Sequence, residues 1–221
     1  FWLKSDRGSS RKTQFRGCFV RHHTEMQPLM PGWTFSSKTN WMLNEDLKCL
    51  SGDNFTLKDH SGEVVMTSAS HLLSIGDKMV VSDARSGHEI FRVNEKVISM
   101  AKTYKIQQGS DVRATVRKKM LSLHGKIHVY AGDESFSATN HAESGNEAII
   151  TIAQKHGWSK RNMVITAGED TNVVIAKSHE DRLNFAGMFG KDEYAIEVEA
   201  GVDVSMIIAV MLCVDEIQED R

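Results

Sequence analysis

Short runs that alternate apolar and polar side chains make up most of the chain between residues 55 and 199. Such alternation is typical of strands that bury one face. Turn sequences rich in Gly, Asp and Ser separate the runs, such as DHSG at 59–62 and ARSG at 84–87. The pattern predicts eleven strands, at 55–58, 63–66, 78–83, 88–93, 103–107, 112–116, 126–131, 148–153, 162–166, 172–177 and 193–199.

A different pattern follows near the C-terminus, where residues 204–214 read VSMIIAVMLCV. Apart from Ser205, this run has no polar face, and Asp203 stands before it as a candidate N-cap. We therefore expect a helix over about 203–217. A helix that is apolar all round must be enclosed by protein or lipid. Eleven residues span roughly 16 Å, about half of a ~30 Å bilayer core, which favours a helix buried in protein.

The strands and this helix suggest one closed structure. An internal repeat, LLSI at 72–75, VISM at 97–100 and MLSL at 120–123, places its serines 25 and then 23 residues apart between predicted strands. A repeat of two short strands per unit indicates a meander, and closing a meander into a barrel removes its exposed edges. About ten strands leave an interior too large for strand side chains alone. We expect the apolar helix to occupy the interior of the barrel.

Composition and charge narrow the class of protein. Residues 1–25 hold six basic side chains against two acidic ones, whereas the remainder is mildly acidic, which argues against a dedicated nucleic-acid binder. We treat residues 1–41 as an unstructured N-terminal extension and 42–221 as one domain. The head of the extension is either a transit or membrane-attracted arm, or upstream sequence read before a start at Met26 or Met30, which we favour. Three scattered cysteines suit a reducing, intracellular compartment: cytoplasm, nucleus or a membrane periphery.

Several longer stretches resemble a known family. DARSGHEIFRV from Asp83, VRATVRKKMLSLHGKIHVYAG from Val112, ITAGEDTNVVIAKSH from Ile165 and GVDVSMIIAVMLCVDEI from Gly201 resemble the LURP-one-related proteins over roughly residues 42–219. That family belongs to the Tubby C-terminal-like superfamily, together with the phospholipid scramblases. The resemblance implies a closed antiparallel β-barrel of roughly a dozen strands enclosing a C-terminal apolar α-helix. It also implies links to pathogen defence, and, through Tubby proteins, phosphoinositide binding by basic barrel residues.

The densest group of cations is the first candidate site. It consists of Arg113, Arg117, Lys118, Lys119 and Lys126. Arg113 and Arg117 lie four residues apart, so they would share one face of an extended strand, and Lys119 could extend that face. Such a group could hold a phosphoinositide headgroup through charge-assisted hydrogen bonds. The alternative interpretation is a solvated outer face of a barrel strand.

A second candidate is the turn HGWS at 156–159, whose Trp158 is flanked by Lys155, Lys160 and Arg161. A tryptophan between cations can insert at a bilayer interface. The alternative is that the ring caps one end of the barrel. This group is predicted as a membrane contact.

Signals of catalysis or metal binding are weak. His124 and His128 could face one way on a strand, but no third ligand follows at a suitable spacing, so no metal site is predicted. The sequence contains no HExxH, G-x-S-x-G, P-loop or dinucleotide fingerprint. Cys213 lies in the apolar run and is expected to be buried and inert. We expect neither enzymatic activity nor a cofactor.

These observations predict a non-enzymatic intracellular binding or regulatory module, expected to be monomeric. Its expected partners are phosphoinositide lipids at a membrane surface, or proteins. One alternative is a scramblase-like membrane protein with residues 204–214 in lipid, although the chain lacks the Cys cluster and proline-rich head of scramblases. Another is a barrel for a small apolar ligand. Lipocalin helices, however, pack outside their barrel and are amphipathic, whereas this helix has no polar face.

Overall fold

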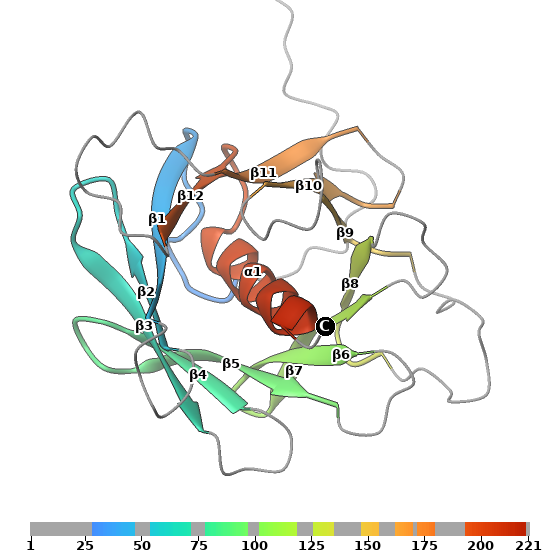
Figure 1. The fold of residues 1–221 in the computed structure, drawn as a ribbon, viewed down its shortest axis with the longest axis horizontal. Coiled ribbons are helices and arrows are strands. Elements are labelled where there is room, and N and C mark those ends of the chain that lie inside the picture. Colours follow the sequence, from blue (N-terminus) through green and yellow to red (C-terminus); the bar gives the residue numbers. More distant parts are fainter. Residues whose placement is uncertain are drawn as a thin grey trace, which may run out of the picture.

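A computed structural model places a ring of strands around a central helix (Figure 1). It describes residues 28–46, 54–71, 78–96, 102–118, 126–134, 147–154, 162–169, 172–179 and 193–219. Along these residues twelve strands follow one another as an antiparallel meander, and β1 pairs with β12 to close the barrel. The predicted fold is therefore confirmed: a closed antiparallel barrel encloses the C-terminal helix.

The strands are short, between five and eight residues each. They are β1 (Thr39–Asp46), β2 (Asn54–Lys58), β3 (Val64–His71), β4 (Lys78–Asp83), β5 (Glu89–Glu95), β6 (Thr103–Gln108), β7 (Asp111–Lys118), β8 (Ile127–Ala131), β9 (Ile150–Gln154), β10 (Met163–Ala167), β11 (Val174–His179) and β12 (Glu193–Val198). The helix is α1 (Val204–Glu219).

The eleven predicted strands coincide with β2 to β12, and the bounds predicted for β4 are those observed. The pattern did not predict β1, in which Trp41, Met42 and Leu43 are consecutive and all buried. Because both faces of β1 are covered here, its sequence lacks the alternation that marks a half-exposed strand. The repeated segments at 72–75, 97–100 and 120–123 lie outside the described residues.

Helix α1 fills the barrel. Every side chain from Val204 to Val214 is buried, and Ile217 is buried one turn further on. Each large apolar side chain removed from water contributes about 1.5–3 kcal/mol, so the helix is a main part of the core. In the structure the barrel encloses residues 204–214, whereas the scramblase-like alternative placed them in lipid. Among the described residues, no helix combines the length and apolar character needed to cross a bilayer.

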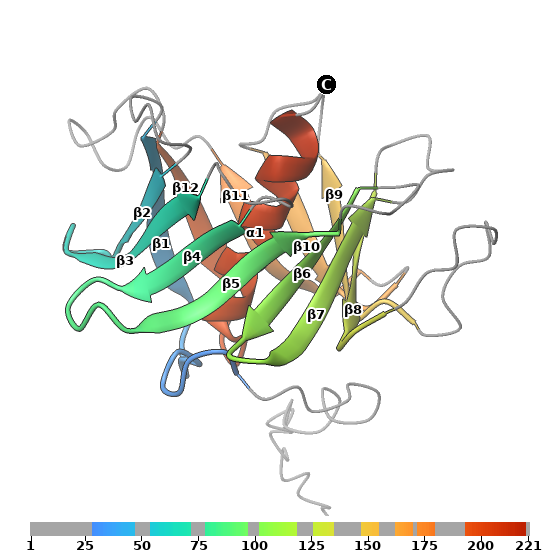
Figure 2. The ribbon, with the colours of Figure 1, turned by 90° about the horizontal axis from the view of Figure 1, so that it is seen from below.

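The segment before β1 closes one end of the barrel. Residues 28–35, here called the N-terminal strap, lie beside the start of α1, while the other end of the helix emerges at the opposite side (Figure 2). The amide of Leu29 donates to Asp203 Oδ2 at 2.9 Å, and the amide of Met30 donates to Ser205 Oγ at 3.1 Å. The predicted N-cap is present, because Asp203 Oδ1 accepts from the Ser205 amide at 3.0 Å.

The strap belongs to the folded unit. Leu29 is 1% exposed and packs in the core. Trp33 stacks on Trp41 of β1, with ring centroids 5.0 Å apart. The domain boundary predicted at residue 42 thus falls inside β1, and the packed structure includes the strap ahead of it. Sequence alternation could not indicate the strap, because hydrogen bonds, core packing and a β-bridge between Thr34 and Asp203 join it to residues far along the chain.

Candidate functional site

Strand β7 carries most of the predicted basic site, and a β-bulge lies at its first cation. Ile106 pairs with Ala114 but Gln107 pairs with Val112, so Arg113 is the extra residue on β7. Bulges commonly redirect a side chain and bend the strand. Arg113 Nη1 donates a hydrogen bond to Gln108 Oε1 at 3.0 Å, and its side chain therefore reaches towards the β6–β7 turn.

Gln108 ties this arginine to the strap. Its Nε2 donates to the carbonyl oxygen of Leu29 and lies 3.4 Å from that of Ile90. The amide thus joins a cation on the outside of the barrel to the buried residue that closes its end. Sequence reasoning did not identify Gln108, because a glutamine before a turn glycine gives no signal of its partners.

Arg117 occupies a different part of β7. It stands opposite His128 in the register with β8, while the neighbouring Val116 and Val129 are buried on the inner face. At about 3.3 Å per strand residue, the Cα atoms of Arg113 and Arg117 lie roughly 13 Å apart. The two arginines therefore lie along one strand without converging on a single small group.

Lys118 and Lys126 lie at the far end of β7 and the start of β8. The register partner of Lys118 is Ile127, the residue that follows Lys126, so the two lysines flank the same hairpin end. Both are partly buried. Lys119 lies outside the described residues. The described cations of the predicted site form a row along β7 and into β8, which we call the basic row: Arg113, Arg117, Lys118 and Lys126.

An acidic turn covers the middle of this row. Thr115 Oγ1 donates to the carbonyl oxygen of Gly132 at 2.8 Å and accepts from the amide of Glu134 at 3.1 Å. The turn after β8 is thereby fixed over the outer face of β7. It places Asp133 2.7 Å from Lys105 Nζ of β6. Lys105 is therefore ion-paired within the protein, and the two ends of the basic row are separated by this turn.

His128 is a buried polar residue on the outer side of the wall, 3% exposed. Its Nδ1 lies 3.7 Å from Glu169 Oε1 and 3.4 Å from Tyr130 Oη. This carboxylate and phenol are contacts typical of a structural histidine. His124 lies outside the described residues, and the parts of the chain that the structure describes contain no group of three His, Cys, Asp or Glu side chains suited to a metal ion.

The predicted membrane contact cannot be placed on the barrel. Its four residues, Lys155, Trp158, Lys160 and Arg161, lie outside the described residues.

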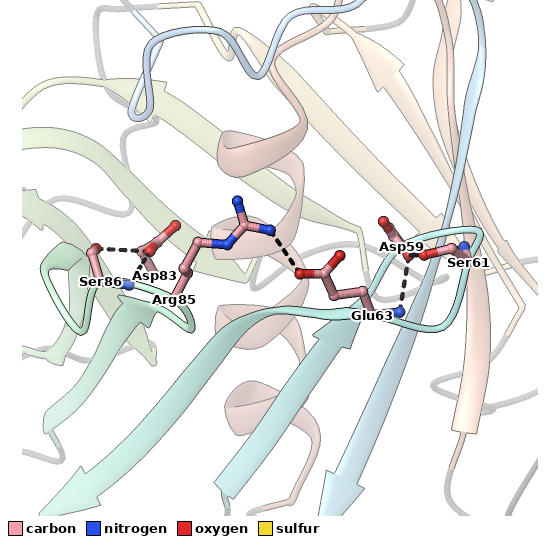
Figure 3. A network of polar contacts seen from close by, with 6 residues as sticks. All are labelled: Asp59, Ser61, Glu63, Asp83, Arg85 and Ser86. Carbon is pink, nitrogen blue, oxygen red and sulfur yellow. Dashed lines mark hydrogen bonds and ion pairs between the residues drawn. The ribbon is translucent and has the colours of Figure 1, made fainter.

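Two neighbouring hairpin turns carry a separate polar network (Figure 3). Asp59 Oδ1 accepts from the amide and hydroxyl of Ser61, and Asp83 Oδ1 does the same from Ser86. In each case the hydroxyl donor is the main cause that lowers the pKa of the carboxyl group. Glu63 and Arg85 join the turns at 2.8 Å.

This network has a structural role. The side chains of Arg85 and Glu63 are 84% and 56% exposed, and such exposed pairs contribute about 0–1 kcal/mol. Gly62 and Gly87 adopt φ values of 83° and 71°, which a side chain at these turns would strain. The DHSG and ARSG sequences therefore specify two rigid turns.

The paired carboxylates of β12 also have a structural partner. Ile196 and Val198 are buried, so Glu197 and the following Glu199 point outward, as their alternation indicates. Lys38 Nζ lies 2.8 Å from Glu197 and 2.7 Å from Glu199. The hydrogen bond to Glu197 is the main cause that raises the pKa of Lys38 to about 12.

The fold and the basic row define a class of protein: a closed antiparallel barrel built around its own C-terminal helix, with cations along one strand of its wall. Within that class, the chain belongs to the LURP-one-related family, whose sequence model matches residues 39–215.

Similar proteins of this family occur in a plant. Protein LURP-one-related 10 of Arabidopsis thaliana is 21% identical over 178 residues, covering 77% of this chain and 86% of the relative. Protein LURP1 of the same plant is 22% identical over 176 residues, covering 77% and 79%. An X-ray structure of an Arabidopsis thaliana protein matches with a TM-score of 0.60 and 18% identity, over 89% of this chain and 99% of that one. This structural similarity concerns the fold alone.

Proposed function

We propose that this barrel is a non-enzymatic regulatory module that binds phosphoinositide headgroups at an anionic membrane surface. The basic row, which consists of Arg113, Arg117, Lys118 and Lys126, would make the contact. Lys119 follows Lys118 in the sequence. The observation that carries the proposal is the placement of these four cations along one strand and the hairpin end that follows it.

The spacing of the row favours a surface over a single small anion. About 13 Å separates the Cα atoms of Arg113 and Arg117, which suits contacts to more than one headgroup. Each Lys or Arg near an anionic membrane contributes about 1 kcal/mol, so the four cations supply at most roughly 4 kcal/mol. The two guanidinium groups add planar, bidentate recognition of phosphate, which the lysines lack. Because the chain has a net charge of −2, attraction to an anionic surface requires a local group of cations such as this row.

Sedimentation with vesicles tests the proposal. Binding is measured to phosphatidylcholine vesicles with and without phosphatidylinositol bisphosphate, and soluble inositol trisphosphate is added as a competitor to separate a free inositol phosphate from a lipid. Arg117→Gln with Lys126→Gln removes two cations of the row. At about 1 kcal/mol each, binding to the bisphosphate vesicles should weaken about 30-fold.

A matched control removes two cations elsewhere. Lys58→Gln with Lys177→Gln makes the same change in net charge on β2 and β11, and should leave binding within about twofold of the original. Equal weakening by both pairs would show a net-charge effect and contradict a site. If the unchanged protein fails to sediment with bisphosphate vesicles, the lipid proposal is wrong and a protein partner becomes the better hypothesis.

A further inference from the structure

A chain of hydrogen bonds links the basic row to the closed end of the barrel. Arg113 donates to Gln108, Gln108 donates to the carbonyl oxygen of Leu29, and the amide of Leu29 donates to Asp203 at the N-terminus of α1. The residues at its ends, Arg113 and Asp203, come from β7 and the start of α1. The connection therefore joins three parts of the molecule: the outer wall, the strap and the central helix.

The amide group of Gln108 can make this connection in only one orientation. Its oxygen accepts from the Arg113 guanidinium, which has donors and no acceptor. Its nitrogen then faces the carbonyl oxygen of Leu29, which has no donor to offer. A reversed amide would place donor against donor and acceptor against acceptor. When the strap is docked, Gln108 is fixed at both ends, and so is the guanidinium that it holds.

We propose that Gln108 is a positioning residue, which fixes Arg113 for a phosphate group and couples headgroup binding to docking of the strap. This inference rests on the proposed lipid function. Gln108 accepts a hydrogen bond from one N–H group of the planar guanidinium and thereby restricts the orientation of that plane. A planar group that is already oriented loses less conformational freedom on binding. Binding at Arg113 and docking of residues 28–35 therefore favour each other.

Coupling between two sites is reciprocal. If the docked strap strengthens headgroup binding by a given factor, a bound headgroup stabilises the docked strap by the same factor. Typical couplings are about 5- to 150-fold, and a connection through single hydrogen bonds should lie near ~5-fold. The strap contains two natural reporters, because the amides of Leu29 and Met30 donate to side chains of the helix N-terminus and are released when the strap opens.

The first experiment needs no variant. Amide hydrogen exchange of Leu29 and Met30 is measured by NMR in the full chain, with and without saturating inositol trisphosphate. Exchange of both amides should slow about 5-fold. The amides of Ser61 and Ser86 donate to Asp59 and Asp83 and have no bond to the strap, so they serve as internal controls and should not change.

The second experiment breaks the connection at its centre. Gln108→Met keeps the shape of the side chain but removes its donor and acceptor, so the dissociation constant for inositol trisphosphate should rise about 5-fold and the ligand should no longer slow exchange at Leu29. Gln107→Met is the matched control, because the neighbouring Gln107 bonds to Asn94 and not to Arg113. If Gln108→Met does not fold, Ser205→Ala loosens the strap from its other side, at the Met30 amide, and should also weaken binding.

The outcomes separate the two proposals. A protein that binds neither inositol trisphosphate nor bisphosphate vesicles would refute the lipid function, and the coupling with it. Binding that leaves Leu29 and Met30 exchange unchanged, together with an unaltered dissociation constant in Gln108→Met, would overturn the coupling alone. Faster exchange of the strap in the presence of ligand would also overturn it, because binding would then release the strap.

Discussion

Replacing Asp203 tests whether the strap and the helix N-terminus form one unit. Asp203 caps α1 through the Ser205 amide and at the same time accepts from the Leu29 amide. In Asp203→Ala both interactions are lost. The cap contributes about 0.5–2 kcal/mol, and an amide of the buried Leu29 left without its acceptor costs about 1–3 kcal/mol. We therefore expect the free energy of unfolding to fall by about 2–4 kcal/mol, a large share of a typical ~5–15 kcal/mol.

Urea unfolding followed by tryptophan fluorescence measures this change, because Trp33 of the strap stacks on Trp41 of β1. Asp111→Ala is the control, since Asp111 is exposed at the β6–β7 turn and its loss should change the free energy of unfolding by less than about 0.5 kcal/mol. If Asp203→Ala is as stable as this control, the strap does not depend on the helix cap and the reasoning is refuted.

The difference in the free energy of unfolding between the original protein and Asp203→Ala should depend on pH. Burial is the main cause that raises the pKa of the Asp203 carboxyl group above its ordinary value of 3.8. A carboxyl group with a raised pKa takes up a proton on folding, so its contribution to stability is fully present below the unfolded pKa and is lost as the pH rises through the folded pKa. The advantage of the original protein over Asp203→Ala should therefore widen as the pH falls towards 3.8. A narrowing advantage would contradict the raised pKa.

Three further expectations follow from the core and the turns. Ile208→Ala, in the enclosed helix, should lower the free energy of unfolding by about 2–5 kcal/mol in the same urea assay, and a loss below 1 kcal/mol would argue against a tightly packed interior. Cys213 is fully buried and desolvation raises the pKa of its thiol, so it should react with a thiol reagent at mildly alkaline pH only after unfolding. Arg85→Ala and Glu63→Ala should each cost less than about 1 kcal/mol, because their ion pair is exposed; a larger loss would show that it holds the two turns together.

Much of the fold could be predicted, and less of the site. Alternating apolar and polar residues identified the strands from β2 onward, whereas the consecutive apolar residues Trp41, Met42 and Leu43 concealed β1, the strand that closes the barrel. The basic row was visible as composition. The bulge at Arg113 was not visible, because it depends on the register between β6 and β7, and this register has no signature in the local sequence.

The sequence by itself determined the two periodic patterns, the turn positions and the need to enclose an apolar helix, because each follows from residues close together in the chain. The tertiary structure alone decided which distant groups meet. Leu29 and Asp203 are 174 residues apart, yet a hydrogen bond between them helps to dock the strap on the helix. Arg113 of β7 donates to Gln108 at the end of β6, a contact that the local sequence did not indicate. Local preferences act over a few residues, whereas such contacts exist only once the barrel has closed.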